Sequence, residues 1–230
     1  MHVTKSTFYI FLVSILLIIP EVAHTQIEGT YTFQCDQADT SYLVNIGTKL
    51  PTLLARWTAS TVDTTWDPRT RYVVELRLKS DASLFQSIVD TATRQISPCV
   101  EFVDINLDGV LDIRIHDNTY MSLDEVYHFW IFNKKKHLFV YSLEFSELSG
   151  DLYVDSLKRT ITQICRTHMS PPCEDKTTYS LVTHHLKVIE HIWDEYHLDN
   201  AGRSMIKTYT QRLVKGKLRT VDVSERYFPD

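Results

Sequence analysis

Apolar and polar residues alternate along much of the chain, which is the pattern of β-strands that bury one face. In residues 71–79 every second position is a tyrosine, valine or leucine, and the positions between them include Glu75 and Arg77. Residues 127–132 and 137–141 are two runs rich in aromatic and aliphatic residues on either side of a polar, lysine-rich tip. The first segment therefore predicts a half-buried strand, and the other two predict a β-hairpin.

Shorter runs of the same kind predict the remaining strands. A brief strand is expected at 31–33, one strand at 153–164, one β-rich segment at 178–193, and a hairpin of 204–214 with 218–223. Strands arrive roughly every 10 to 15 residues, and no convincing long helix separates them. The pattern therefore predicts an all-β antiparallel meander, either propeller-like or sandwich-like.

Two segments leave their structure open. Residues 51–57 suit a helical turn that leads into a threonine-rich loop. Asp81 can cap a short helix over residues 84–89, whose apolar side chains would then share one face. The same 84–89 residues also suit a strand.

The segment Asp104–Asp112 has the composition of a metal-binding loop between two strands. Acidic or amide side chains occupy four of the five alternate positions, all but Val110, and no lysine or arginine lies among them. Carboxylates this close repel one another unless a cation neutralises them, and hard oxygen donors of this kind suit Ca²⁺. Gly109 permits a sharp turn, because glycine adopts a positive φ at little cost. The predicted ligands are the side chains of Asp104, Asn106, Asp108 and Asp112 and the backbone carbonyl of Val110.

The loop is not an EF-hand. The twelfth position, where an EF-hand has a bidentate glutamate, is Ile115. Instead, the five-ligand pattern leading into a strand resembles the calcium loops of FG-GAP and VCBS repeats. An ordinary turn is the alternative, because Asp-Gly pairs are common turn chemistry. The expected role of Ca²⁺ here is structural, since no nucleophile or general base accompanies it.

The first 25 residues have the composition of a secretory signal peptide. Lys5 lies in a short positive region, an apolar run of about a dozen residues follows, and Ala23 and Thr25 suit cleavage before Gln26. The apolar run is shorter than the roughly 20 residues of a membrane span. We therefore expect a secreted or periplasmic protein without a stable membrane span, in which residues 26–230 form a single all-β calcium-binding domain.

Charge and cysteine content add two expectations. The formal net charge is −5, and it is unchanged by loss of residues 1–25, so nucleic-acid binding is not expected. Four cysteines in an oxidising compartment are expected to form disulfides, for which three pairings are possible. Cys165 with Cys173, leaving Cys35 with Cys99, is the pairing that we favour.

Motifs of common enzymes are missing from the sequence. The histidines at 184, 185, 191 and 197 lack the His-Glu-x-x-His spacing of a zincin, and we interpret them as surface or hydrogen-bonded histidines. Gly-x-Ser-x-Gly, Walker and dinucleotide motifs do not occur. The protein is therefore expected not to be an enzyme, and no catalytic residue is predicted.

The order of features after the loop resembles one protein family. The calcium loop, the aromatic strand that ends in Trp130, Ile131, Phe132 and Asn133, the lysine-rich tip, and the strand with Phe139 and Tyr141 follow one another in that order. Together with the signal peptide, this is similar to exported bacterial calcium-binding immunity proteins against peptidoglycan hydrolases. The resemblance implies a propeller-like β fold, bound calcium and inhibition of a lysozyme-like enzyme.

The resemblance also implies a partner-binding segment. Lysozyme inhibitors of this general kind insert a Ser-Gly loop with a nearby tyrosine into the hydrolase cleft, and Ser149, Gly150 and Tyr153 form the matching stretch. An ordinary turn between strands is the alternative interpretation. The main alternative function is a calcium-dependent extracellular adhesion or matrix-binding module.

Overall fold

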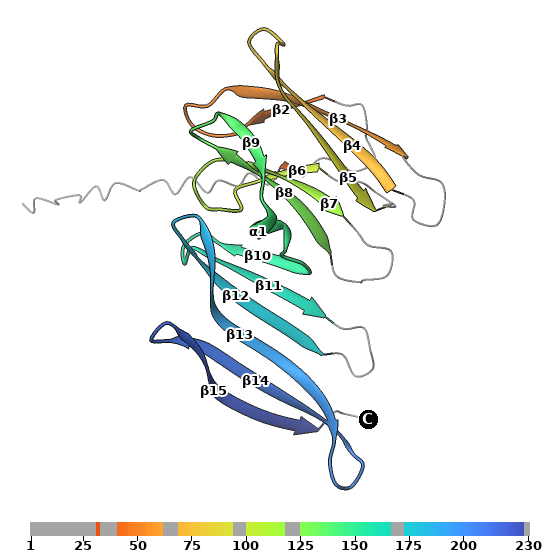
Figure 1. The fold of residues 1–230 in the computed structure, drawn as a ribbon, viewed down its shortest axis with the longest axis vertical. Coiled ribbons are helices and arrows are strands. Elements are labelled where there is room, and N and C mark those ends of the chain that lie inside the picture. Colours follow the sequence, from red (N-terminus) through yellow and green to blue (C-terminus); the bar gives the residue numbers. More distant parts are fainter. Residues whose placement is uncertain are drawn as a thin grey trace, which may run out of the picture.

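The computed structural model describes residues 31–32, 41–61, 69–93, 100–117, 125–166 and 173–227. They form three sheets and one short helix (Figure 1), and every strand pair is antiparallel. The N-terminal sheet contains β2 (Ser41–Asn45), β3 (Thr52–Thr61), β4 (Arg69–Leu78) and β5 (Leu84–Thr93). The central sheet contains β1 (Tyr31–Thr32), β6 (Val100–Val103), β7 (Asp112–Asp117), β8 (Val126–Asn133) and β9 (Leu138–Tyr141).

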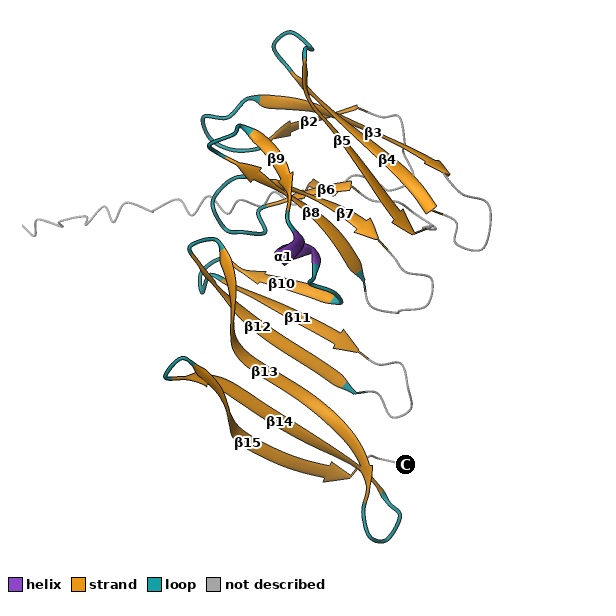
Figure 2. Cartoon of the chain, viewed as in Figure 1, coloured by secondary structure: helices purple, strands orange, loops and turns teal. Residues whose placement is uncertain are grey.

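The last third of the chain forms the C-terminal sheet, a simple meander in which each strand pairs with the next. It contains β10 (Asp151–Asp155), β11 (Thr160–Arg166), β12 (Glu174–Val182), β13 (His185–Leu198), β14 (Ser204–Val214) and β15 (Lys217–Tyr227). Helix α1 (Leu143–Ser146) connects it to the central sheet. Strands clearly dominate in Figure 2, and the all-β prediction is confirmed.

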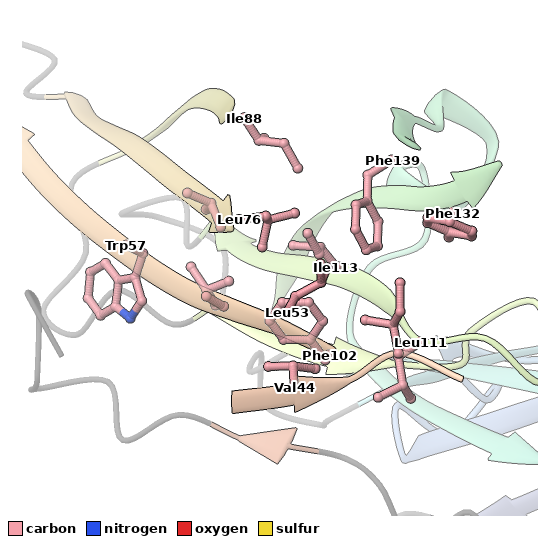
Figure 3. Close-up of a cluster of buried hydrophobic side chains, with 14 of the residues drawn as sticks. Val44, Leu53, Trp57, Leu76, Ile88, Phe102, Leu111, Ile113, Phe132 and Phe139 are labelled. Atoms are coloured by element: carbon pink, nitrogen blue, oxygen red, sulfur yellow. The ribbon is translucent and has the colours of Figure 1, made fainter. Parts of the chain in front are cut away.

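The N-terminal and central sheets pack face to face as a sandwich, which is the sandwich-like arrangement of the two that the sequence predicted. Alternate residues of each strand point into the space between the sheets, as the period-two pattern requires. Figure 3 shows this core. Its fully buried members include Leu53, Trp57, Leu76, Phe102, Ile113 and Phe139.

A second core joins the sandwich to the C-terminal sheet. Phe129 projects from the opposite side of β8 and contacts Phe145 of α1, with ring centroids 6.3 Å apart. Ile161 of β11 and Leu181 of β12 belong to the same cluster. The central sheet is therefore buried on both faces at this place, whereas β14 and β15 extend beyond the core (Figure 1).

Several predicted strands have the expected positions, and others need correction. The hairpins β8–β9 and β14–β15 and the strand β4 are confirmed. The strand predicted at 153–164 and the β-rich segment predicted at 178–193 are each interrupted by a turn. In the second, Thr183 and His184 have φ values of 50° and 69°, so the chain reverses there although neither residue is a glycine.

The two open segments are both strands. The interpretation of 51–57 as a helical turn was wrong, because β3 pairs along its length with β2 and β4 and buries Leu53 and Trp57 against the central sheet. Residues 84–89 belong to β5 and not to a helix. In both cases pairing with neighbouring strands overrides a weak local preference.

The favoured Cys165–Cys173 disulfide is not present, because Cys165 is a free thiol. The register of β11 and β12 places Asp175, not Cys173, opposite Cys165. The predicted signal peptide and the other two cysteines, Cys35 and Cys99, lie outside the described residues.

Candidate functional site

The predicted metal loop connects β6 to β7 at one end of the central sheet, between the two cores. Gly109 has a φ of 80° and Leu107 a φ of 54°, so the chain turns sharply twice within three residues. The side chain of Val110 packs in the sandwich core, and the backbone N–H of Leu111 donates to the carbonyl of Ile46, the residue after β2 (2.8 Å). The C-terminal end of the loop is thus held against the sandwich.

Three of the predicted ligand side chains turn inward and bind the loop's own backbone. Asp104 accepts the N–H of Asp108 at 3.0 Å and that of Gly109 at 2.8 Å. Asn106 also accepts the Asp108 N–H, and Asp108 accepts the N–H of Val110 (2.9 Å). Desolvation by burial raises the pKa of Asp104, and the charge of Asp108 adds to this effect. The loop therefore concentrates oxygen acceptors around one backbone turn.

Asp112 is the unusual member of this group, because its carboxylate is fully buried with 0% exposure. Its Oδ1 accepts the backbone N–H of Phe132 (2.8 Å), whereas Oδ2 has no hydrogen-bond partner. Burial raises the pKa of Asp112 well above its usual range, and the charges of Asp108 and Asp104 raise it further. A buried acceptor without a partner is costly and needs an explanation.

Two cationic side chains reach the loop from neighbouring turns. The Lys134 ammonium lies 2.8 Å from the carbonyl oxygen of Asp108 and 3.3 Å from its carboxylate. The Arg159 guanidinium donates to the carbonyl oxygen of Leu107 at 3.1 Å. Both contacts compensate the negative potential of the loop.

The donors fit a hard cation better than a soft one, because all of them are oxygens. Asp112 Oδ2 is a buried oxygen that needs a partner, and Asp104, Asn106 and Asp108 belong to the same short loop. However, no group of three His, Cys, Asp or Glu side chains in the described part of the chain has the arrangement of a metal site. The acids are gathered in one loop, but their oxygens point to backbone amides rather than to one common centre.

The second predicted site, the partner-binding stretch, is distributed over two environments. Gly150 is buried, donates its N–H to Glu125 (2.6 Å) and has a φ of 73°, and a β-carbon there would meet the Ile164 carbonyl oxygen at 2.3 Å. The Ser149 hydroxyl accepts a hydrogen bond from Gln163 (3.3 Å). Tyr153, on β10, is 55% exposed. Of these three residues, Tyr153 offers the accessible contact surface.

Two of the four clustered histidines have carboxylate partners. His185 lies 3.0 Å from Glu144, and His191 lies 3.0 Å from Asp175. Both belong to the hydrogen-bonded class that the sequence predicted.

Sequence reasoning missed a charged cluster across the sandwich. His128 of β8 lies between Asp90 of β5 (2.9 Å) and Asp117 of β7 (3.3 Å), and Asp90 also accepts from the Trp130 indole (2.9 Å). The hydrogen bonds to Asp117 and Asp90 raise the pKa of His128 to about 9, and the bond to Asp117 has the larger effect. Both ring nitrogens are engaged, so His128 links β5, β7 and β8 through two ion pairs. We call these three residues the Asp90–His128–Asp117 clasp. The one local signal is that His128 and Trp130 share a face of β8.

These features define an antiparallel β-sandwich that is extended by an open sheet and carries an acidic loop rich in oxygen donors. The fold is shared with a solved structure described as a Xanthomonas Type IV secretion system related protein. The TM-score is 0.53 at 15% sequence identity, and the match covers 84% of this chain and 98% of that chain.

Other comparisons give no assignment. No family model matches the chain, and no curated protein matches it. Among the described residues, no helix has the length and apolar character needed to span a membrane.

Proposed function

We propose that this chain is an exported, non-enzymatic calcium-binding protein that binds and inhibits a peptidoglycan hydrolase as an immunity factor. In this proposal Ca²⁺ is bound by Asp104, Asn106, Asp108, Asp112 and the carbonyl of Val110, and it holds the junction between the two cores rigid. Tyr153 on β10 is the accessible residue of the partner-binding stretch.

The fully buried Asp112 carboxylate carries the calcium part of the proposal. One of its oxygens has no hydrogen-bond partner, and burial together with the charges of two further aspartates raises its pKa. A divalent cation would satisfy that oxygen and neutralise its neighbours at the same time. Reorienting Asp104 and Asp108 away from the backbone amides would complete the donor set, at the cost of three backbone hydrogen bonds.

The hydrolase part is supported by the family resemblance of the loop and the strands after it. It is compatible with the fold shared with a secretion system related protein, although a likeness at 15% identity concerns the fold alone. The formal charge of −5 is also suited to a basic partner.

Two measurements test the two parts separately. Calorimetric titration of the chelator-stripped protein should detect Ca²⁺ uptake at micromolar to millimolar concentrations, and no heat of binding would refute the metal part. Peptidoglycan hydrolysis by the major lysozyme types, assayed with and without the protein, should show inhibition of at least one type. Replacement of Tyr153 by alanine should weaken that inhibition while calcium uptake stays unchanged.

A further inference from the structure

The last strand, β15, is a long outer edge of the C-terminal sheet. It runs over the 11 residues Lys217–Tyr227 and pairs with β14 on one side (Figure 2). Every residue of the strand is exposed. Among the described residues, no strand pairs with its other side. Such an edge presents unpaired backbone N–H and C=O groups and is a template for pairing with another strand.

The other outer strands among the described residues are shorter than β15, and the longest of them, β5, has 10 residues. The outer strand at the opposite side of the same sheet, β10, has five residues. The edge of β9 in the central sheet is covered by Gln86, whose side-chain amide exchanges two hydrogen bonds of 2.8 Å with the backbone of Phe139. The length and exposure of β15 therefore distinguish it from these edges.

A β-bulge decides which residues of β15 share a face. Thr220 lies opposite Gln211 and Asp222 opposite Thr210, so Val221 is the extra residue. Arg219 lies opposite Arg212, two residues from Thr210, and therefore shares a face with Asp222. By the same reasoning Leu218 and Val223 share the other face, since they lie opposite Leu213 and Tyr209.

Two charged residues of β15 lack an oppositely charged partner in the described part of the chain. Arg219 faces the like charge of Arg212, whose guanidinium binds Glu190 (2.8 Å). Within the described part of the chain neither Arg219 nor Asp222 has an ion-pair partner. An acid opposite Arg219 and a base opposite Asp222 on a neighbouring strand would supply both missing ion-pair partners.

We propose that the outer edges of β15 from two copies of this chain pair in antiparallel fashion about a two-fold axis, forming a dimer with one continuous sheet. With the axis at the bulge, Arg219 of each copy lies opposite Asp222 of the other, and Leu218 lies opposite Val223. Each contact occurs twice and joins residues on the same face of the sheet.

A register with a longer overlap brings less favourable residue pairs together. A shift by two residues toward a longer overlap places Lys217 opposite Arg226 and Leu218 opposite Glu225, so it sets like charges together and an apolar residue against an acid. Charge therefore disfavours the longer overlap. The opposite shift pairs only residues 217–222 and places Thr220, not an acid, opposite Arg219. Because the two-fold pairing occupies the β15 edge of both copies and leaves only the short β10 edges of the continuous sheet, the assembly ends at the dimer instead of growing into a fibre.

A charge-exchange experiment tests this pairing. Sedimentation velocity of the full mature chain over a micromolar to millimolar range should show a reversible monomer–dimer equilibrium. R219D and D222R, measured singly, should each weaken dimerisation by about tenfold or more, because each places two like-charge pairs across the axis. Mixing the two variants should restore association as a heterodimer, since acid again meets base at every pair.

A matched control and the contrary outcomes complete the test. K79D makes the same change in net charge as R219D, but at the exposed turn between β4 and β5, and it should leave dimerisation unchanged. A wild-type chain that remains monomeric up to millimolar concentration overturns the proposal. So does a dimer that neither single variant weakens, or a variant mixture that does not associate. Calcium uptake is measured on the same samples, so failure of the dimer is distinguishable from failure of the metal site.

Discussion

At the scale of single residues, the Asp112 carboxylate concentrates the main physical conflict of this protein. Its carboxyl group is buried at the start of β7, with one oxygen accepting from the Phe132 amide and the other without a partner. Burial of a charge is tolerated when a counter-charge or a function compensates it. We therefore expect Asp112 to lower the stability of the folded protein without a cation and to raise it when a cation is bound.

The effect of Asp112→Asn on stability should therefore change sign when Ca²⁺ is added. In chelator the variant should be more stable than the wild type by about 1 kcal/mol, because a neutral amide is cheaper to bury and can donate to the nearby aspartates. In saturating Ca²⁺ the order should reverse, since binding to the folded state stabilises the wild type by about 2.7 kcal/mol at 100 times its Kd. Urea unfolding of both proteins, in chelator and in saturating Ca²⁺, measures these free energies. The same order of stability under both conditions would contradict the prediction.

Lys134 is expected to compete with the metal. Its ammonium lies 3.3 Å from the Asp108 carboxylate, where it serves as an internal counter-charge. Lys134→Ala should therefore tighten Ca²⁺ binding about two- to fivefold, as loss of a weak surface ion pair implies. Calorimetric titration measures the change, and Lys136→Ala is the control, because Lys136 lies on the same turn with its backbone N–H on Asn133. An unchanged Kd for Lys134→Ala would show that the two cations occupy different places.

At the scale of elements, the Asp90–His128–Asp117 clasp joins three strands from both layers of the sandwich. The pKa of His128 rises from 6.5 to about 9 through hydrogen bonds to Asp117 and Asp90. A raised folded-state pKa means that the protonated histidine stabilises the fold fully below about pH 6.5. That contribution is lost as the pH rises through about 9.

The clasp predicts a specific pH dependence. Between pH 6 and pH 10 the wild type should lose about 3 kcal/mol more unfolding free energy than His128→Gln, since one pKa unit corresponds to about 1.4 kcal/mol. Glutamine can still hydrogen bond but does not titrate, so the difference between the two curves isolates His128. Denaturant titrations at several pH values supply the measurement. Identical pH profiles would exclude the clasp as a stabilising ion pair.

At the scale of the whole molecule, α1 and its contacts decide whether the two halves act as one unit. Phe145 is 2% exposed and packs between Phe129 of β8 and the C-terminal sheet. The adjoining loop brings Ser149 into a β-bridge with Val126. The second core is small, so each of its aromatic residues carries a large share of the coupling.

Phe145→Ala should destabilise the protein by about 3–5 kcal/mol, as expected for a large-to-small change in a core. The C-terminal sheet should also become the first target of limited proteolysis, because the cavity lies where it joins the sandwich. Leu143→Ala on the same helix is the matched control, since Leu143 is 64% exposed. If both variants melt alike, the second core does not couple the halves.

Sequence patterns were informative wherever the evidence was local. Period-two alternation identified β4, the β8–β9 hairpin and the all-β class, and clustered acids identified the loop between β6 and β7. They failed at 51–57, where strand pairing overrode a weak helical preference, and at 183–184, where two non-glycine residues adopt positive φ. The cysteine pairing also depended on a strand register that local sequence does not encode.

Alternation of side chains and a run of acids are properties of neighbouring residues, so the sequence by itself determined that this chain forms antiparallel strands around one acidic turn. Which sheet covers which, the burial of Asp112, and the meeting of Asp90 with His128 all join residues far apart in the chain. Only the tertiary structure decided these, because distant groups acquire their burial and their partners when the sheets pack together. The bulge that aligns Arg219 with Asp222 belongs to the same class, since it exists only in the pairing of β15 with β14.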